Sequence, residues 1–227
     1  MQSRETGRFR CDGRFERALF RRGYQTIAGV DEAGRGSLFG PVFAAAVIFP
    51  PDVRIVGLRD SKELGPARRE ELAGEISATA TAWAVGRADA AEIDRINIYQ
   101  ASRLAMQRAI VRLSPPPDFL LVDALSVDLL LPQRGLIKGD ARSRSIAAAS
   151  ILAKVHRDAC MREWDAFYPQ YGLARGKGYG TREHLAALEQ FGPTPQHRFT
   201  FEPVGRLLPP RQMPLGLAMG AGGGACR

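Results

Sequence analysis

The stretch Ile27-Ala28-Gly29-Val30-Asp31-Glu32-Ala33-Gly34-Arg35-Gly36 decides what fold and what chemistry are expected of this chain. The apolar run from Thr26 to Val30 predicts a buried strand, which delivers two consecutive carboxylates into a glycine-containing loop. Burial of two adjacent carboxylates is unfavourable unless a cation or a proton compensates them. A positively charged group is therefore expected at this junction.

Three interpretations of the junction are open. A dinucleotide-binding loop would have to be followed by a helix, but the apolar run from Val42 to Phe49 and the two prolines after it predict a second strand and hence a hairpin. The hairpin could simply expose an acidic pair at its tip. It could also build a hard-metal site beside a glycine loop that lets a polyanion approach. Carboxylates elsewhere in the chain must decide between these interpretations.

Two further apolar segments end in an acid. Residues 118–123 predict an interior strand with Asp123 at its carboxyl end, and residues 136–140 repeat the pattern with Asp140. Ligand sites in open α/β sheets gather outside the carboxyl ends of strands. Asp31 and Asp123 are therefore expected to meet if their strands are parallel neighbours.

The rest of the chain reads as alternating helices and one more strand. Helices are predicted over 66–79, over 90–98 and 99–113, from a Ser143 or Ser145 cap to Phe167, and from a Thr181 cap to Gly192, with a strand near 83–86. Asp158 is predicted to be a solvated helix charge. Residues 175–180 predict a flexible basic loop with one aromatic residue, suited to a phosphate contact and a stacking surface or to a plain surface turn.

The composition is that of one sizeable globular domain of 227 residues with a net charge of +8. Residues 1–25 carry +4 and residues 205–227 carry +3, which leaves +1 for the body, so the basic ends either help hold a polyanion or only aid solubility. The three widely spaced cysteines predict free thiols and no structural zinc. The longest apolar run has eight residues and no signal peptide is recognisable, so a cytoplasmic protein is expected.

Seven motifs, in this order and spacing, resemble bacterial ribonuclease HII over roughly residues 15–204. They are Val30-Asp31-Glu32-Ala33-Gly34-Arg35-Gly36, Asp60-Ser61-Lys62, Val122-Asp123, Lys138-Gly139-Asp140, Ala148-Ala149-Ser150-Ile151-Leu152-Ala153-Lys154, Lys177-Gly178-Tyr179-Gly180-Thr181 and His197-Arg198. The resemblance implies an α/β, ribonuclease H-like fold, with a mixed five-stranded sheet flanked by helices and a helical C-terminal extension. A flexible basic leader over 1–14 and a disordered Pro/Gly-rich tail over 205–227 are expected around this catalytic domain.

The resemblance also implies an endonuclease that hydrolyses the RNA strand of RNA–DNA hybrids and nicks 5′ of a ribonucleotide embedded in duplex DNA. Two Mg²⁺ or Mn²⁺ ions are expected, with nucleic acid as the partner of a monomer that has no membrane contact. The tail shows no aromatic pair of the kind that docks on a sliding clamp. The implied catalytic and metal-binding residues are Asp31, Glu32, Asp123 and Asp140, and the implied substrate-binding residues are Gly34, Arg35, Gly36, Tyr179, Lys62 and Lys177.

One geometric difficulty follows, since adjacent strand side chains point to opposite faces. Asp31 and Glu32 can share a site only if the strand distorts there or a backbone carbonyl takes the place of a side chain, and a distortion of the strand is expected. The chain also departs from the family, with Ser37 and Gly176 in place of other residues and with no Gly-Asn after Asp123. A ribonuclease HIII-like enzyme and a non-catalytic hybrid-binding protein remain as alternatives, although the short leader, Asp140 and the full set of acids speak against them.

Overall fold

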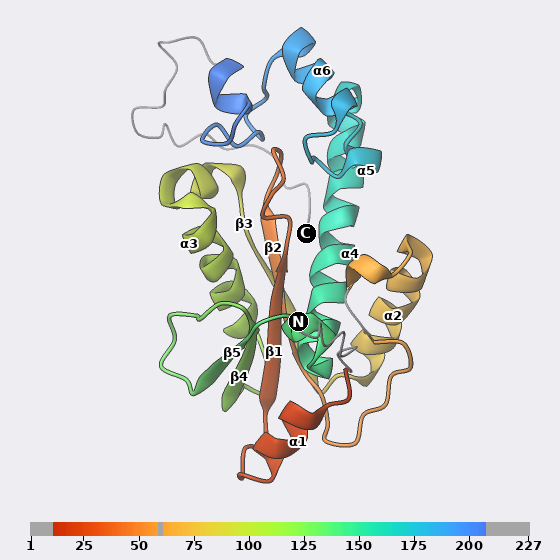
Figure 1. Ribbon diagram of the computed structural model, residues 1–227, viewed down its shortest axis with the longest axis vertical. Coiled ribbons are helices and arrows are strands. Elements are labelled where there is room, and N and C mark those ends of the chain that lie inside the picture. Colours follow the sequence, from red (N-terminus) through yellow and green to blue (C-terminus); the bar gives the residue numbers. More distant parts are fainter. Residues whose placement is uncertain (1–10, 59–60, 208–227) are drawn as a thin grey trace, which may run out of the picture.

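The computed structural model describes residues 11–58 and 61–207, which form a five-stranded sheet with helices on both faces (Figure 1). The strands lie in the order β3-β2-β1-β4-β5, where β1 pairs antiparallel with β2 and parallel with β4. The β2–β3 pair is antiparallel and the β4–β5 pair is parallel. The predicted mixed five-stranded sheet is confirmed. Its strands are β1 (Ile27–Ala33), β2 (Val42–Ile48), β3 (Ala82–Ala88), β4 (Phe119–Asp123) and β5 (Gln133–Leu136).

Helix α3 covers one face of the sheet and α4 with α2 covers the other, while α5 packs beside the C-terminal part of α4 and α6 lies near that end (Figure 1). Within the described ranges no helix combines the length and apolar character that crossing a bilayer requires. The helices are α1 (Arg14–Phe20), α2 (Pro66–Thr79), α3 (Ala90–Ile110), α4 (Arg144–Phe167), α5 (Leu173–Gly176) and α6 (Arg182–Phe191), with 3-10 turns η1 (Ser61–Glu63), η2 (Gly139–Ala141), η3 (Pro169–Tyr171) and η4 (Val204–Leu207).

The helix ends follow local sequence signals. Ser143 caps α4, because its side chain accepts a hydrogen bond from the Ile146 amide, and Thr181 caps α6 in the same way. Pro66 occupies the first turn of α2, whose bounds match the prediction. The range labelled α3 contains two helices separated by the non-helical residue Asn97, where φ is 65° and ψ is 163°, so the two helices predicted between residues 90 and 113 are confirmed.

Strand β1 sorts its side chains between the two helical layers. Ala28 and Val30 pack in the core on the α3 side, whereas Gly29 faces the start of α4. A Cβ added at Gly29 would lie 2.1 Å from the main-chain carbonyl carbon of Ser145, so glycine is what lets α4 approach the sheet this closely. Since side chains alternate along a strand, Asp31 also faces α4.

Two boundary predictions are corrected by the structure. β1 runs to Ala33, so Asp31 and Glu32 lie in the strand and not in the loop, because β1 pairs with β2 that far. β5 ends at Leu136, and Asp140 lies in the separate turn η2.

The predictions for the chain ends and the cysteines are tested only in part. Residues 1–10 and 208–227, including the segment considered for clamp binding, lie outside the described part, but residues 205–207 belong to η4, so the predicted disorder is wrong there. Cys11 is a free thiol as expected, whereas Cys160 is disulfide-bonded, so the prediction of free thiols is wrong for Cys160.

Candidate active site

Three aspartates gather at the carboxyl ends of β1 and β4. Asp31, Asp123 and Asp140 each offer one carboxylate oxygen, and these oxygens lie within 4.8 Å of one another. The parallel pairing of β1 with β4 brings the first two together, and η2 supplies the third. The Ser150 hydroxyl of α4 lowers the pKa of Asp31, and the Gly139 amide donates to Asp123 Oδ1 at 2.7 Å. The predicted meeting of the acids is confirmed.

The electrostatics of this cluster call for a cation. Burial raises the pKa of Asp31 well above its usual value, and the neighbouring Glu32 and Asp123 carboxylates raise it further. Glu32 Oε2 is buried without a hydrogen-bond partner among the described residues. Clustered carboxylate oxygens are the donors that hard divalent cations prefer. The residues therefore fit Mg²⁺ or a similar ion.

Glu32 lies beside the cluster rather than within it. The ladder between β1 and β2 keeps an unbroken register through Asp31, Glu32 and Ala33, so the predicted strand distortion is wrong. Glu32 Oε1 accepts a hydrogen bond from Arg35 at 3.3 Å. Burial raises the pKa of Glu32, Arg35 lowers it, and Asp123 raises it again, so the Glu32 carboxylate lies within electrostatic reach of the aspartates.

The glycine loop and the tyrosine predicted to read the substrate lie together. A Cβ added at Gly36 would lie 3.9 Å from Cε1 of Tyr179, which is exposed. Gly34 has a φ of 96°, and a Cβ there would lie 2.0 Å from Arg157 Nε. Both the backbone conformation and the packing therefore require glycine at position 34.

The two predicted lysines are placed differently. Lys62 Nζ lies 3.9 Å from Asp140 Oδ2 and its side chain is mostly exposed, so Lys62 stands at the solvent side of the acids.

Lys177 takes part in its loop through its main chain, because its carbonyl accepts a hydrogen bond from Arg157 at 2.8 Å. The hydroxyl of Ser37 also donates to the Gly178 carbonyl at 2.9 Å. This loop is packed, so the prediction of a flexible loop is wrong.

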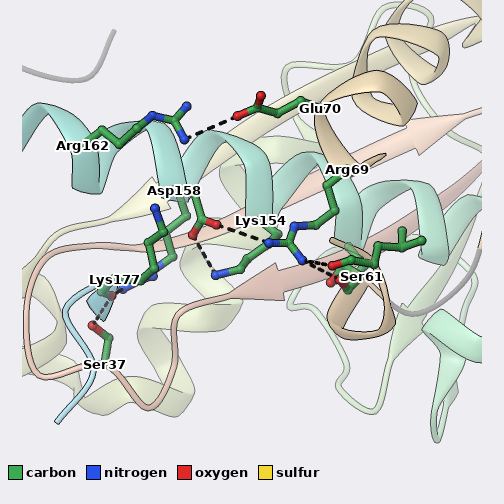
Figure 2. A network of polar contacts seen from close by, with 11 residues as sticks. Ser37, Ser61, Arg69, Glu70, Lys154, Asp158, Arg162 and Lys177 are labelled. Carbon is green, nitrogen blue, oxygen red and sulfur yellow. Dashed lines mark hydrogen bonds and ion pairs between the residues drawn. The ribbon is translucent and has the colours of Figure 1, made fainter. Parts of the chain in front are cut away.

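A polar network next to the acids was not predicted (Figure 2). The hydroxyl groups of Ser61 and Ser150 form a hydrogen bond of 2.9 Å, and Arg69 donates a hydrogen bond to the Ser61 carbonyl at 3.0 Å. Asp158 is buried, accepts from Lys154 at 2.7 Å and pairs with Arg69 at 3.8 Å. The prediction that Asp158 is solvated is therefore wrong, because α2 covers it. The spacing of Lys154 and Asp158, four residues apart on a helix, was the available signal.

Two fully buried arginines contact the predicted substrate-reading residues, and these contacts were not predicted. Arg157 stacks over the Tyr179 ring, with its guanidinium carbon 5.3 Å from the ring centroid. Arg198 donates to main-chain carbonyls of the loop after β1. Arg198 lies in a motif that resembles the family, but the sequence offers no indication of what its side chain contacts.

The sheet order and the acid cluster place the protein in the class of ribonuclease H-like nucleases. Among solved structures, the chain is similar to the ribonuclease H2 of Pyrococcus horikoshii OT3, with a TM-score of 0.67 and 26% identity over 80% of this chain and 96% of the other. It is also similar to the structure of a PCNA:RNase HII complex from Archaeoglobus fulgidus, with a TM-score of 0.66 and 25% identity over 78% and 95% of the two chains.

The sequence comparisons give the family. The family model described as Ribonuclease HII matches residues 28–204, and a Ribonuclease HII of Solibacter usitatus (strain Ellin6076) is 61% identical over 198 residues, which cover 87% of each chain. The chain belongs to the ribonuclease HII family. It is a ribonuclease H endonuclease, and members of this metal-dependent family act on nucleic acids.

Proposed function

We propose that this endonuclease hydrolyses the RNA strand of RNA–DNA hybrids and nicks duplex DNA on the 5′ side of an embedded ribonucleotide, leaving 5′-phosphate and 3′-hydroxyl ends. The observation that carries the proposal is the cluster of Asp31, Asp123 and Asp140, whose oxygens lie within 4.8 Å of one another. The cluster follows the same strand that leads into the glycine loop. Removal of ribonucleotides from DNA is the corresponding role in the cell.

Asp31, Glu32, Asp123 and Asp140 would hold two divalent ions, Mg²⁺ or Mn²⁺. When bound, such ions supply an activated water and stabilise the charge that develops on the departing 3′ oxygen. The protein's own groups orient the ligands, because the Glu32 amide donates to Asp31 Oδ1 and the Gly139 amide donates to Asp123 Oδ1, each at 2.7 Å. The exposed ammonium of Lys62 stands beside Asp140, where it can contact a phosphate of the substrate.

Substrate reading is assigned to the loop Gly34–Gly36 and to Tyr179. The absence of side chains at Gly34 and Gly36 lets main-chain amides approach a ribose, whose 2′-hydroxyl distinguishes RNA from DNA. Tyr179, near Gly36, would stack on the following deoxyribose, a surface that a further hydroxyl would disturb. Arg35 and Lys177 supply positive charge at this edge for phosphate contacts.

We also propose domain bounds, a cellular location and an oligomeric state for the enzyme. The catalytic unit is residues 15–204, with a leader over 1–14 and a tail over 205–227. We infer a cytoplasmic monomer whose partner is nucleic acid, since the predicted substrate is a polyanion and the chain is basic.

The test is cleavage of an end-labelled DNA duplex with one ribonucleotide, in Mg²⁺ or Mn²⁺, by the wild type and by Asp123→Asn. A metal-dependent nick immediately 5′ of the ribonucleotide, lost in Asp123→Asn, supports the proposal. Asp128→Asn is the matched control, because Asp128 is an exposed acid in the connection after β4, and it should cut normally. Cleavage of long hybrids alone would favour a ribonuclease HIII-like enzyme, and cleavage of neither substrate would favour a hybrid-binding protein.

A further inference from the structure

A single buried guanidinium holds the loop that follows β1. Arg198 donates from Nη2 to the Gly34 carbonyl at 2.8 Å, from Nη1 to the Arg35 carbonyl at 2.7 Å and from Nε to the Gly40 carbonyl at 3.0 Å. Its own amide donates to the Leu38 carbonyl at 2.9 Å. One residue near the C-terminal end of the described chain thus fixes the loop through four hydrogen bonds.

The positive charge of Arg198 is stabilised by hydrogen bonds to main-chain carbonyl groups. Its side chain is fully buried and forms no ion pair with a described carboxylate, and the Phe201 ring lies 5.1 Å from its guanidinium carbon. Burial lowers the pKa of Arg198 to about 9, so the group is charged at neutral pH. Burying a charge without a counter-ion is unfavourable unless several hydrogen bonds satisfy it. A planar guanidinium can direct its donors to neighbouring carbonyls in a way that lysine cannot.

The anchored carbonyls determine where the neighbouring amides point. A trans peptide is planar, and its C=O and N–H groups point in opposite directions. Because the Gly34 and Arg35 carbonyls face Arg198, the N–H groups of Arg35 and Gly36 face away from it. Neither N–H donates to any residue in the described part of the chain, and Gly36 is exposed. Gly36 itself lies near Tyr179, since a Cβ added there would lie 3.9 Å from Cε1 of the tyrosine.

We propose that Arg198 is a positioning residue for ribonucleotide selection, which aims the Arg35 and Gly36 amides at the 2′-hydroxyl of the target ribose. Arg198 acts only through the loop and is buried away from the substrate. Hydrogen bonds that polarise the two carbonyls also strengthen the amides as donors, because both groups belong to the same peptide units. The inference rests on the proposed function, since it needs a substrate that carries a ribose.

The experiment compares Arg198→Lys, which keeps the positive charge but loses the guanidinium fork, with Arg112→Lys. Arg112 is a matched control, because it donates one hydrogen bond to the Val85 carbonyl at 2.9 Å on the far edge strand. We expect Arg198→Lys to lower kcat/KM on a single-ribonucleotide duplex by about 10- to 100-fold, the loss for two misaligned hydrogen bonds. Its Kd for the all-DNA duplex should change less than about twofold, because phosphate contacts give that affinity.

Several outcomes would overturn the inference. If Arg198→Lys cuts the single-ribonucleotide duplex as the wild type does, the fork has no role in selection; if it loses affinity for both duplexes equally, its role is only structural. If Arg198→Lys fails to fold, NMR of the wild type decides: the Arg35 and Gly36 amide signals must shift more on binding the ribonucleotide duplex than on binding all-DNA. A wild type that cuts no ribonucleotide duplex would refute the proposed function itself.

Discussion

Asp158→Asn should be among the most destabilising single-atom changes in this protein. The Asp158 carboxylate is buried between two cations, with Lys154 Nζ at 2.7 Å and Arg69 Nη2 at 3.8 Å (Figure 2). The side chains of Lys154 and Arg69 are only 21% and 12% exposed, so solvent cannot replace the lost charge. Removing one partner of a buried ion pair costs roughly 3–5 kcal/mol. We expect a loss of about 3 kcal/mol in the free energy of unfolding at pH 7.

The loss of stability in Asp158→Asn should depend on pH, because it involves the protonation of Lys154. Burial already lowers the pKa of Lys154, and Asp158 raises it again. Without Asp158 the folded pKa of Lys154 falls further below the ordinary lysine value of about 10.4. Between these two pKa values the unfolded chain binds more protons than the folded chain, so the stability of the variant rises with pH. The deficit of Asp158→Asn should therefore shrink as the pH rises toward 10.

Urea unfolding followed by circular dichroism measures both effects, with Glu70→Gln as the matched control. Glu70 pairs with Arg162 at 3.4 Å across the same two helices, but both side chains are more than half exposed. Exposed pairs contribute about 0–1 kcal/mol, so Glu70→Gln should be nearly neutral. If the two variants lose the same stability, or if the deficit of Asp158→Asn does not depend on pH, the buried network does not stabilise the fold as argued.

Three further changes have expected outcomes. Ala124→Gly should raise the free energy of unfolding by roughly 0.5–1 kcal/mol in urea titrations, because Ala124 has a φ of 50°, and an unchanged midpoint would contradict this. Gly29→Ala should cost about 3 kcal/mol, since the new Cβ would meet the Ser145 main chain at 2.1 Å, and a folded variant of normal stability would show that α4 can move. His197 shares a hydrogen bond of 3.0 Å with His184, and burial lowers the pKa of His197 to about 3. The free energy of unfolding should therefore fall as the pH drops below about 6.5, by up to 1.4 kcal/mol per pH unit. A His197→Gln variant with the same pH slope would refute this.

The elements of the sheet and the meeting of the aspartates were predictable because their signals are local. Strands follow apolar runs, and the start of α2 follows from Pro66. Asp31 and Asp123 end up together since parallel neighbouring strands finish at one edge. The left-handed conformation of Ala124 had no local signal, because alanine rarely adopts a positive φ.

The errors arise where a partner lies far away in the sequence. Whether β1 extends through Glu32 depends on its pairing with β2, and no property of the residue itself decides it. Asp158 is buried because α2 packs against α4, and Arg198 reaches carbonyls that lie more than 160 positions earlier. Periodicity and capping describe one segment at a time and contain no information on such contacts.

Helix α4 relates the acid cluster to the cations. Ser150, Lys154 and Asp158 stand four residues apart, so they share one face of the helix. Ser150 lowers the pKa of Asp31, and Lys154 lies one turn further along, where an unrestrained ammonium would be drawn to the aspartates and would compete with a divalent ion. Asp158 instead holds Lys154 at 2.7 Å and draws it along the helix away from the cluster. The buried ion pair therefore leaves the carboxylates of the aspartates available for a metal ion.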